Sequence, residues 1–261
     1  MSENIYTSLQ LREVFHLELL RCFGRKIKPE YYSLKGGVNL RFFFNSFRYS
    51  EDMDLDIQAV RVEVVCKTVM DILESVLFKN SLIPFGVKEI IPPDIVKAKQ
   101  TQTTQRFKVH LISPANEDFF TKIEFSRRGF KGKVVNQVVQ NSILRLYKSP
   151  PLVVPHYDIL SAIAQKINAL SARTVIQARD IFDLYILMPQ YKISKKDKLN
   201  LDEIKLNTAH ENIFEVSVEQ FRDTVLAYLS IEDQKVYNAD LVWDEIKLKV
   251  AGFIEELRNY V

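Results

Sequence analysis

Two aspartates at alternate positions, Asp52 and Asp54, are the residues of this chain best suited to hold a metal ion. They lie in the stretch RYSEDMDLDIQ, where apolar and acidic residues alternate, and this pattern predicts a half-buried strand with its carboxylates on the polar face. Side chains two residues apart on a strand point the same way, so these carboxylates repel each other unless a cation lies between them. Mg²⁺ binds carboxylate oxygens and leaves coordination sites for phosphate. A pair formed by Asp54 and Asp56 is chemically possible as well.

A third carboxylate on a neighbouring strand would complete such a site. Glu124 is the best candidate, because the predicted strand FTKIEFS turns Lys122 and Glu124 away from the core. Three carboxylates that hold two metal ions suit in-line phosphoryl or nucleotidyl transfer.

A double glycine, Gly36–Gly37, stands upstream of the acidic strand in a chain with only 7 glycines among 261 residues. The stretch GGVNLRFFFNSF predicts a helix over 36–46 that is entered directly from the glycines. Glycines at such a position let backbone N–H groups approach a phosphate, and the helix N-terminus favours an anion. Lys35 and Ser50 could add contacts to the phosphate, and we expect the short helix to return Asp52 to the glycines. An ordinary turn beside a solvated strand end is the alternative interpretation.

The stretch LKGGVNLRFF…RYSEDMDLDI resembles the opening motif of the AbiEii-type nucleotidyltransferases. These are toxins of type IV toxin–antitoxin and phage-abortive systems, within the DNA polymerase β-like superfamily. The family pattern is a Gly-Gly-Ser/Thr turn, a helix and then R-x-S-x-D-x-D, which Arg48, Ser50, Asp52 and Asp54 match. Val38 stands where the family has Ser or Thr, so a hydroxyl contact to phosphate is lost or replaced.

A second motif, within 159–187, resembles the family's A-x-K helix and the R-D-x-x-D-L segment that follows it. The matching residues are Lys166, Arg173, Arg179, Asp180 and Asp183. Lys166 and Arg173 are seven residues apart and share one face of a helix, as do Asp180 and Asp183 at a spacing of three. A surface lysine and an Arg179–Asp183 helix ion pair are the alternative interpretations.

The resemblance implies roles for these residues. The helical half would pack over the catalytic sheet, Lys166 and Arg173 would bind the triphosphate of an NTP, and Asp180 would activate the attacking hydroxyl. Asp183 would orient Arg179 or the helix packing. The resemblance also implies Mg²⁺ as cofactor, an RNA acceptor (the 3′ end of tRNA being the expected one) and a cognate winged-helix antitoxin as partner.

The elements that must position these residues divide the chain in two. Helical and strand patterns alternate up to about residue 153, with helices expected over 4–23, 36–46 and 60–79 and strands over 48–58, 106–112 and 120–126. Helical patterns then follow over 158–173, 175–188, 217–229 and 239–260, with a polar loop over 192–200. Together with the resemblance, this order predicts an α+β fold. A polymerase β-like nucleotidyltransferase domain with a mixed sheet and flanking helices (1–153) would precede a C-terminal helical bundle (154–261).

Composition narrows the class of protein further. With 47% hydrophobic and 26% charged residues the chain is globular, and Cys22 and Cys66 lie in no C-x-x-C motif that would indicate a zinc site. No apolar run reaches the roughly 18 residues needed to span a bilayer, and no basic-then-apolar leader opens the chain, so we expect a cytoplasmic protein without a membrane partner.

Positive charge gathers between residues 97 and 148, where eleven basic and three acidic residues leave a net charge of +8. A solvated face is one interpretation, and a surface for polyphosphate or nucleic acid is the other. Two further functions fit the same motifs: nucleotidylation of a protein partner, and a catalytically inactive module that captures RNA or a partner. Val38 favours the inactive module mildly, whereas the retained Asp52, Asp54, Lys166 and Asp180 favour the enzyme.

Overall fold

The computed structural model describes residues 6–192 and 201–259. The loop expected over 192–200 therefore lies outside the described residues apart from its first position, as do the ends of the expected helices at residues 4, 5 and 260.

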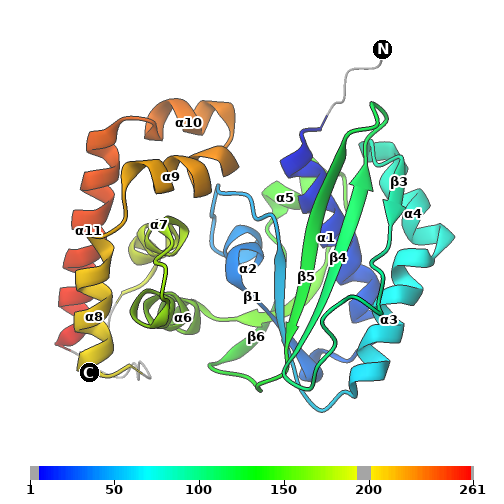
Figure 1. Cartoon of the computed structure of the whole chain (residues 1–261), viewed down its shortest axis with the longest axis horizontal. Coiled ribbons are helices and arrows are strands. Elements are labelled where there is room, and N and C mark those ends of the chain that lie inside the picture. Colours follow the sequence, from blue (N-terminus) through cyan, green and yellow to red (C-terminus); the bar gives the residue numbers. More distant parts are fainter. Residues whose placement is uncertain (1–5, 193–200, 260–261) are drawn as a thin grey trace. The chain divides into compact units, whose positions relative to one another are not determined.

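The chain forms two compact units, which Figure 1 colours along the sequence. The sheet unit comprises Met1–Phe43 and Tyr49–Tyr157, and the helical unit comprises Phe44–Arg48 and Asp158–Val261. The chain therefore leaves the sheet unit at Phe43, passes through the helical unit for five residues and returns. The boundary expected after residue 153 falls at the first residue of a strand that belongs to the sheet unit.

Within the described residues, one mixed sheet of seven strands organises the sheet unit, which confirms the α+β class. Its order is β3-β4-β5-β2-β1-β7-β6. The β2–β5 and β1–β7 pairs are parallel and the other pairs are antiparallel. The strands are β1 Tyr32–Lys35, β2 Met53–Ile57, β3 Glu89–Ile91, β4 Thr104–Ile112, β5 Asp118–Ser126, β6 Val134–Val138 and β7 Val153–Tyr157.

The sheet unit contains two helices, α3 and α4, that the sequence pattern predicted as a single helix. The helices of this unit are α1 Ser8–Gly24, α2 Gly36–Phe43, α3 Val62–Glu74, α4 Val76–Leu82 and α5 Asn141–Leu146, with short 3₁₀ turns at Pro29–Tyr31 and Ile83–Phe85. The single helix expected over 60–79 is wrong, because Ser75 adopts an extended conformation (ψ 126°) and separates α3 from α4. The helix expected over 36–46 ends at Phe43, and Asn45 just beyond it is left-handed (φ 51°), a conformation that asparagine tolerates.

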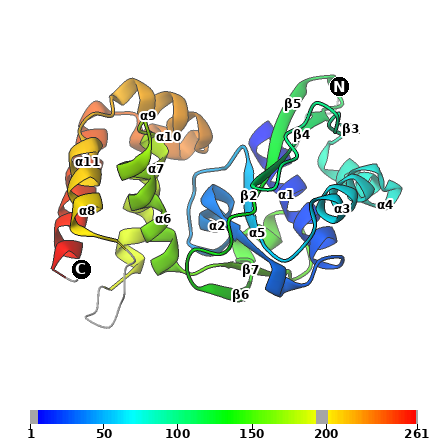
Figure 2. The same cartoon turned by 60° about the horizontal axis from the view of Figure 1, so that its bottom comes forward.

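The helical unit contains α6 Ile159–Ala172, α7 Ala178–Leu187, α8 Glu203–Ile213, α9 Val218–Thr224, α10 Ile231–Tyr237 and α11 Asp240–Arg258, with 3₁₀ turns at Met188–Gln190 and Leu226–Tyr228. Figure 2 shows α6, α7, α8 and α11 side by side. Trp243 of α11 is buried, stacks on Phe221 of α9 at 4.5 Å between ring centroids and donates its indole N–H to the carbonyl oxygen of Val216. This contact ties the last helix to the middle of the unit.

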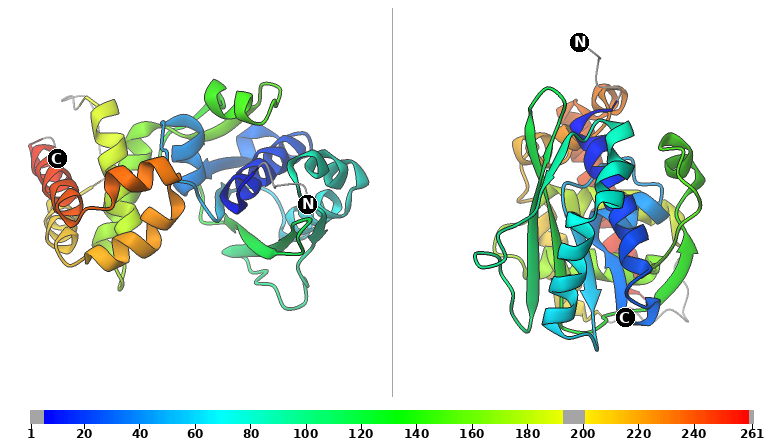
Figure 3. Two further views of the ribbon diagram at one scale, coloured as in Figure 1. Left: turned by 90° about the horizontal axis from the view of Figure 1, so that it is seen from above. Right: turned by 90° about the vertical axis from the view of Figure 1, so that its right-hand side faces the viewer.

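The two faces of β4 and β5 differ in polarity and burial. One face buries alternating apolar residues, among them Phe107, Val109, Ile123 and Phe125, in a core shared with α1 and α3. The right panel of Figure 3 shows these two helices along one side of the long strands. The other face carries polar and charged side chains and is open, as the alternation in the sequence predicted.

A buried histidine joins α1 to the sheet. His16 is 1% exposed, and its Nε2 lies 2.7 Å from Thr121 Oγ1 on β5. The Thr121 hydroxyl donates its one hydrogen to the carbonyl oxygen of Glu51, so His16 must donate from Nε2–H. Burial lowers the pKa of His16 to about 3, with Asp52 opposing the shift and Arg12 adding to it. His16 is therefore neutral in the folded protein.

We expect His16 to stay neutral as the pH falls from 8 to 4.5, which an NMR titration of its imidazole resonances measures. An unfolded histidine titrates near pH 6.5, so the unfolded chain binds a proton that the folded chain refuses. The free energy of unfolding of the wild type should therefore fall, relative to that of His16→Asn, as the pH drops below about 6.5. His110→Asn, at a part-exposed histidine, is the matched control. An inflection of the His16 signal near pH 6.5 would contradict the assignment.

Candidate active site

β2, which carries Asp54 and begins directly after Asp52, lies in the middle of the sheet between β5 and β1. Asp54 is the register partner of Glu124 on β5 and of Lys35 on β1, and Glu124 is in turn paired with Arg106 on β4. Register partners share a face of the sheet. The fold therefore gathers Lys35, Asp54, Glu124 and Arg106 into one row across four strands, with the two carboxylates in the middle and a basic residue at each end.

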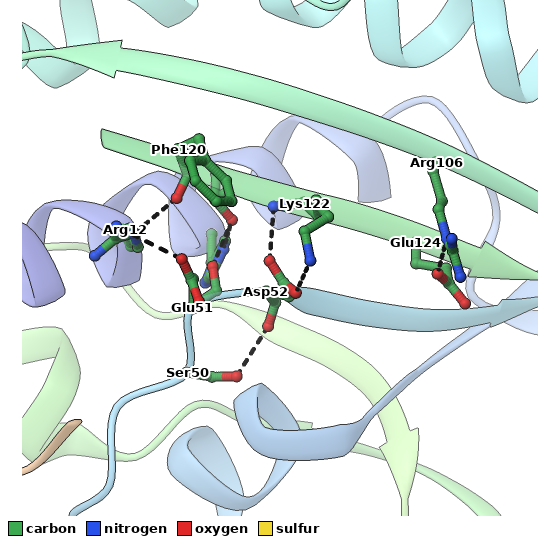
Figure 4. Close-up of polar contacts among 10 residues, drawn as sticks. Arg12, Ser50, Glu51, Asp52, Arg106, Phe120, Lys122 and Glu124 are labelled. Atoms are coloured by element: carbon green, nitrogen blue, oxygen red, sulfur yellow. Dashed lines mark hydrogen bonds and ion pairs between the residues drawn. The ribbon is translucent and has the colours of Figure 1, made fainter. Parts of the chain in front are cut away.

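Asp52 lies one residue before β2 and is held against β5. Its Oδ1 accepts a hydrogen bond from the backbone N–H of Lys122 at 3.0 Å, and its Oδ2 lies 2.8 Å from Lys122 Nζ (Figure 4). The Ser50 hydroxyl donates to the carbonyl oxygen of Asp52 at 2.9 Å. The predicted phosphate ligand Ser50 thus shapes the turn that presents Asp52.

Gly36 opens α2 in contact with the acidic strand. Its φ of +68° lies in the left-handed region, and a Cβ added to it would lie 2.7 Å from Asp54 Oδ2. The double glycine therefore does return to the acidic strand. The expected neighbour was Asp52, but Gly36 lies against Asp54. The reason is the antiparallel register of β1 and β2, which places the residue before the glycines, Lys35, opposite Asp54.

Asp56 points to the same face, but it is buried and occupied. Its Oδ1 lies 2.6 Å from Lys35 Nζ, and its Oδ2 accepts a hydrogen bond from the Tyr157 hydroxyl at 2.5 Å. Burial, with this hydrogen bond to Asp56, raises the pKa of Tyr157. Lys35, expected to contact phosphate, therefore neutralises Asp56, and Asp56 joins β2 to β7.

The carboxylate oxygens of Asp52, Asp54 and Glu124 suit a hard divalent cation. The three carboxylates do not, however, converge on one point. Glu124 pairs with Arg106, and Asp52 pairs with Lys122. In the part of the chain that the structure describes, no three Asp, Glu, His or Cys side chains form a group that could hold a metal ion. Lys122 and Arg106 are both partly exposed, so they can move aside and leave carboxylate oxygens of the kind that Mg²⁺ prefers.

The second motif forms a buried ionic cluster inside the helical unit. Arg48 donates Nε and Nη2 to the carboxylate of Asp183 at 2.9–3.0 Å, and Lys166 Nζ lies 2.6 Å from Asp183 Oδ2 and 2.8 Å from Asp180 Oδ1. Arg173 Nη1 lies 3.0 Å from Asp180 Oδ2 as an ion pair without hydrogen-bond alignment. Asp183 is 0% exposed and Asp180 is 1% exposed. We call these five residues the Arg48–Asp183 cluster.

The charges of this cluster are mutually stabilised. Burial would raise the pKa of Asp183, but Arg48 and Lys166 outweigh it and hold the pKa below the ordinary value. Burial would lower the pKa of Lys166, but Asp180 and Asp183 reverse the shift and raise it. Asp183 and Lys166 are therefore both charged at neutral pH.

Asp183 has a different partner from the one the sequence suggested. Arg179 is exposed and makes no ion pair with the described residues, so the expected Arg179–Asp183 pair is wrong. Arg48 takes that place from 135 positions away, because the segment Phe44–Arg48 belongs to the helical unit. Lys166 and Asp180, which were predicted to contact the substrate, form an ion pair with each other. Arg173 is the most exposed member of the cluster.

Comparison with known proteins decides the family. The family model of the nucleotidyl transferase AbiEii toxin, type IV toxin–antitoxin system, matches residues 18–247, which is most of the chain. The chain belongs to the AbiEii family. It is therefore a nucleotidyltransferase of the toxin class, and its family implies an antitoxin partner. No curated protein matched the chain at a significant level.

Several solved structures share the fold of this chain. A candidate nucleotidyltransferase from Helicobacter pylori is 18% identical, with a TM-score of 0.56 over 97% of this chain and 99% of that chain. MenT4, a nucleotidyltransferase toxin from Mycobacterium tuberculosis, is 18% identical, with a TM-score of 0.58 over 95% of this chain and 84% of its own. At these identities the likeness concerns the fold.

Among the described helices, none is long and apolar enough to cross a membrane.

We expect Gly36→Ala to lower nucleotidyl transfer by about 100-fold or more, because its Cβ must displace the Asp54 carboxylate and a displacement of about 1 Å is enough for such a loss. Gly129→Ala is the matched control, since Gly129 is also left-handed (φ +78°) but has open space around it. Both variants should lose about 1–2 kcal/mol of stability from backbone strain, and only Gly36→Ala should lose activity. Equal activities of the two variants would show that the contact with Asp54 is dispensable.

We expect Asp183→Asn to lower the free energy of unfolding by about 3–5 kcal/mol at pH 7, because it leaves Arg48 and Lys166 buried without their shared counter-charge. Asp71→Asn, which removes an exposed helix ion pair with Lys67, should cost less than about 1 kcal/mol. Denaturant titration measures both values.

A comparison of the wild type with Asp183→Asn at several pH values tests the lowered pKa of Asp183. A carboxyl group whose pKa is lower in the folded state stabilises the fold above its unfolded pKa of about 3.9 and loses that contribution as the pH falls through the folded pKa. The stability difference between wild type and Asp183→Asn should stay constant above about pH 5 and narrow below about pH 4. A difference that widens on acidification would contradict the assigned direction.

Proposed function

We propose that this protein transfers a nucleoside monophosphate from an NTP to a hydroxyl of an RNA acceptor, the 3′ end of tRNA, with Mg²⁺ as cofactor. The observation that carries the proposal is the contact between the left-handed Gly36 at the start of α2 and the carboxylate of Asp54. A helix start offers backbone N–H groups to phosphate, and the adjacent carboxylates offer oxygen ligands to a divalent cation. Phosphate and metal chemistry thus meet at one point of the sheet unit.

In this proposal Asp52 and Asp54 hold Mg²⁺, and Glu124 is the third carboxylate available on the same face. The bound ion would neutralise the negative charge that develops on the transferred phosphoryl group. Lys122 and Arg106, which neutralise Asp52 and Glu124 here, would exchange these partners for phosphate oxygens. Gly36 and Gly37 seat the β- and γ-phosphates at the N-terminus of α2, with Lys35 beside them as a positive charge.

The reaction balances as an in-line displacement. The acceptor hydroxyl oxygen forms a bond to the α-phosphorus, the bond from that phosphorus to the bridging oxygen breaks, and pyrophosphate leaves. The hydroxyl proton passes to a base, for which Asp180 remains our proposal, and Lys166 and Arg173 remain proposed triphosphate ligands. These three roles require the ion pairs of the Arg48–Asp183 cluster to open when substrate binds.

The direct test incubates the purified protein with each labelled NTP, Mg²⁺ and total tRNA. We expect labelled RNA with the wild type and at least about 100-fold less with Asp54→Asn, because a metal ligand and a neighbour of the phosphate site are removed together. Asp71→Asn, an equal charge change on α3, should label RNA as the wild type does. EDTA should abolish labelling, and added Mg²⁺ should restore it.

Three results would redirect the proposal. Wild-type labelling by Asp54→Asn would remove the metal assignment. Label that enters protein and spares RNA would indicate nucleotidylation of a protein partner. Absence of label and of any thermal stabilisation by all four NTPs with Mg²⁺ would indicate an inactive binding module.

We further propose that this activity arrests growth in the cytoplasm, serves in defence against phage and is countered by a winged-helix antitoxin. Family membership supports the toxin class. Expression of the wild type should then arrest growth, whereas Asp54→Asn should be tolerated at the same protein level.

A further inference from the structure

A basic pocket opens on the polar face of the sheet unit. It has a volume of about 470 Å³ and lies between the segment 91–99 and the strands β4 and β5. Its basic wall comprises Lys97, Lys99, Arg106, Lys108, His110 and Lys122. Ile91, Pro92, Pro93 and Ala98 supply an apolar wall, and Asp94 is its acidic member. We call it the β4–β5 pocket.

The pocket holds more positive charge than its carboxylates can balance. Lys97 pairs with Asp94, Arg106 with Glu124 and Lys122 with Asp52. Lys99 and Lys108 have no carboxylate partner among the described residues, and the Lys108 ammonium lies 4.1 Å from the centroid of the Phe120 ring. Two cations that are exposed and uncompensated in a concave surface attract an anion.

The pocket is also continuous with the proposed metal ligands. Lys122 lines it and donates both its ammonium and its backbone N–H to the carboxylate of Asp52 (Figure 4). Arg106 and Lys108 point to the same face as Glu124 and Lys122, with which they are in register on β5. An anion in the β4–β5 pocket would therefore lie beside the acidic end of β2, on the side away from Gly36.

We infer that the β4–β5 pocket binds the sugar–phosphate backbone of the RNA acceptor, an inference that rests on the proposed function. Arg106, Lys108 and His110 recur at every second residue of β4, a repeat of about 6.7 Å, which suits a chain of successive phosphates better than one compact triphosphate. The basic wall of the pocket is made of side chains, which contact phosphates without reading sequence. The start of α2, across β2, is the separate place for the triphosphate.

Fluorescence anisotropy of a labelled single-stranded RNA, with no NTP present, tests the inference. We expect Lys99→Gln/Lys108→Gln to raise the Kd for RNA on the order of tenfold and to make the slope of log K against log salt shallower by about 1.4, since each lost phosphate contact removes about 0.7. Neither residue belongs to the catalytic machinery. The KM for NTP should stay unchanged, while the KM for tRNA in the labelling reaction should rise.

Lys26→Gln/Lys67→Gln is the matched control, because it removes the same charge at exposed lysines, one following α1 and one on α3. Equal Kd values and salt slopes for the two double variants would overturn the inference. A raised KM for NTP in Lys99→Gln/Lys108→Gln would also overturn it, by assigning the pocket to the triphosphate. The anisotropy assay measures RNA binding without any reaction. If the pocket binds RNA but the protein labels no RNA, the proposed function is refuted and the inference about the pocket still stands.

Discussion

The bidentate hydrogen bond between Arg48 and Asp183 is the interaction that holds the segment Phe44–Arg48 in the helical unit. Both side chains are withdrawn from water, so each charge is tolerable only because the other is present. The bond fastens the segment Phe44–Arg48 to α7 inside the helical unit, and the chain returns to the sheet unit at Tyr49, four residues before β2. Asp52 and the strand that carries Asp54 thus follow, within a few residues, a segment held by buried charge.

Charge compensation governs the candidate residues of each unit. On the sheet, Lys122, Arg106 and Lys35 neutralise Asp52, Glu124 and Asp56. In the helical unit, Lys166 is shared by two aspartates. A charged ligand that enters either place must exchange partners with groups already paired, so binding replaces existing contacts. This favours ligands that bring charges of both signs, such as a nucleotide with its metal ion.

Periodicity in the sequence was enough to predict the elements whose two faces differ. Apolar and polar residues alternate over most of β4 and β5 and throughout β2, so these strands and the shared face of Asp54 and Glu124 could be inferred. β3 has only three residues, too few to show a period, and β7 contains Pro155, which is unusual inside a strand. Neither strand could therefore be predicted from its pattern. α8 and α10 were missed as well. Register and long-range pairing lay beyond reach, since nothing local to Arg48 indicates that its partner is Asp183, or that Gly36 meets Asp54 and not Asp52.

The left-handed glycine at the start of α2 also has a genetic meaning. At Gly36 the backbone conformation disfavours every other residue, and the smallest side chain already collides with a carboxylate of the acidic strand. Every missense change at this codon adds at least that one carbon atom. For a protein of a toxin class, we expect codon 36 to be a place where any amino-acid replacement lowers the activity while most of the fold survives.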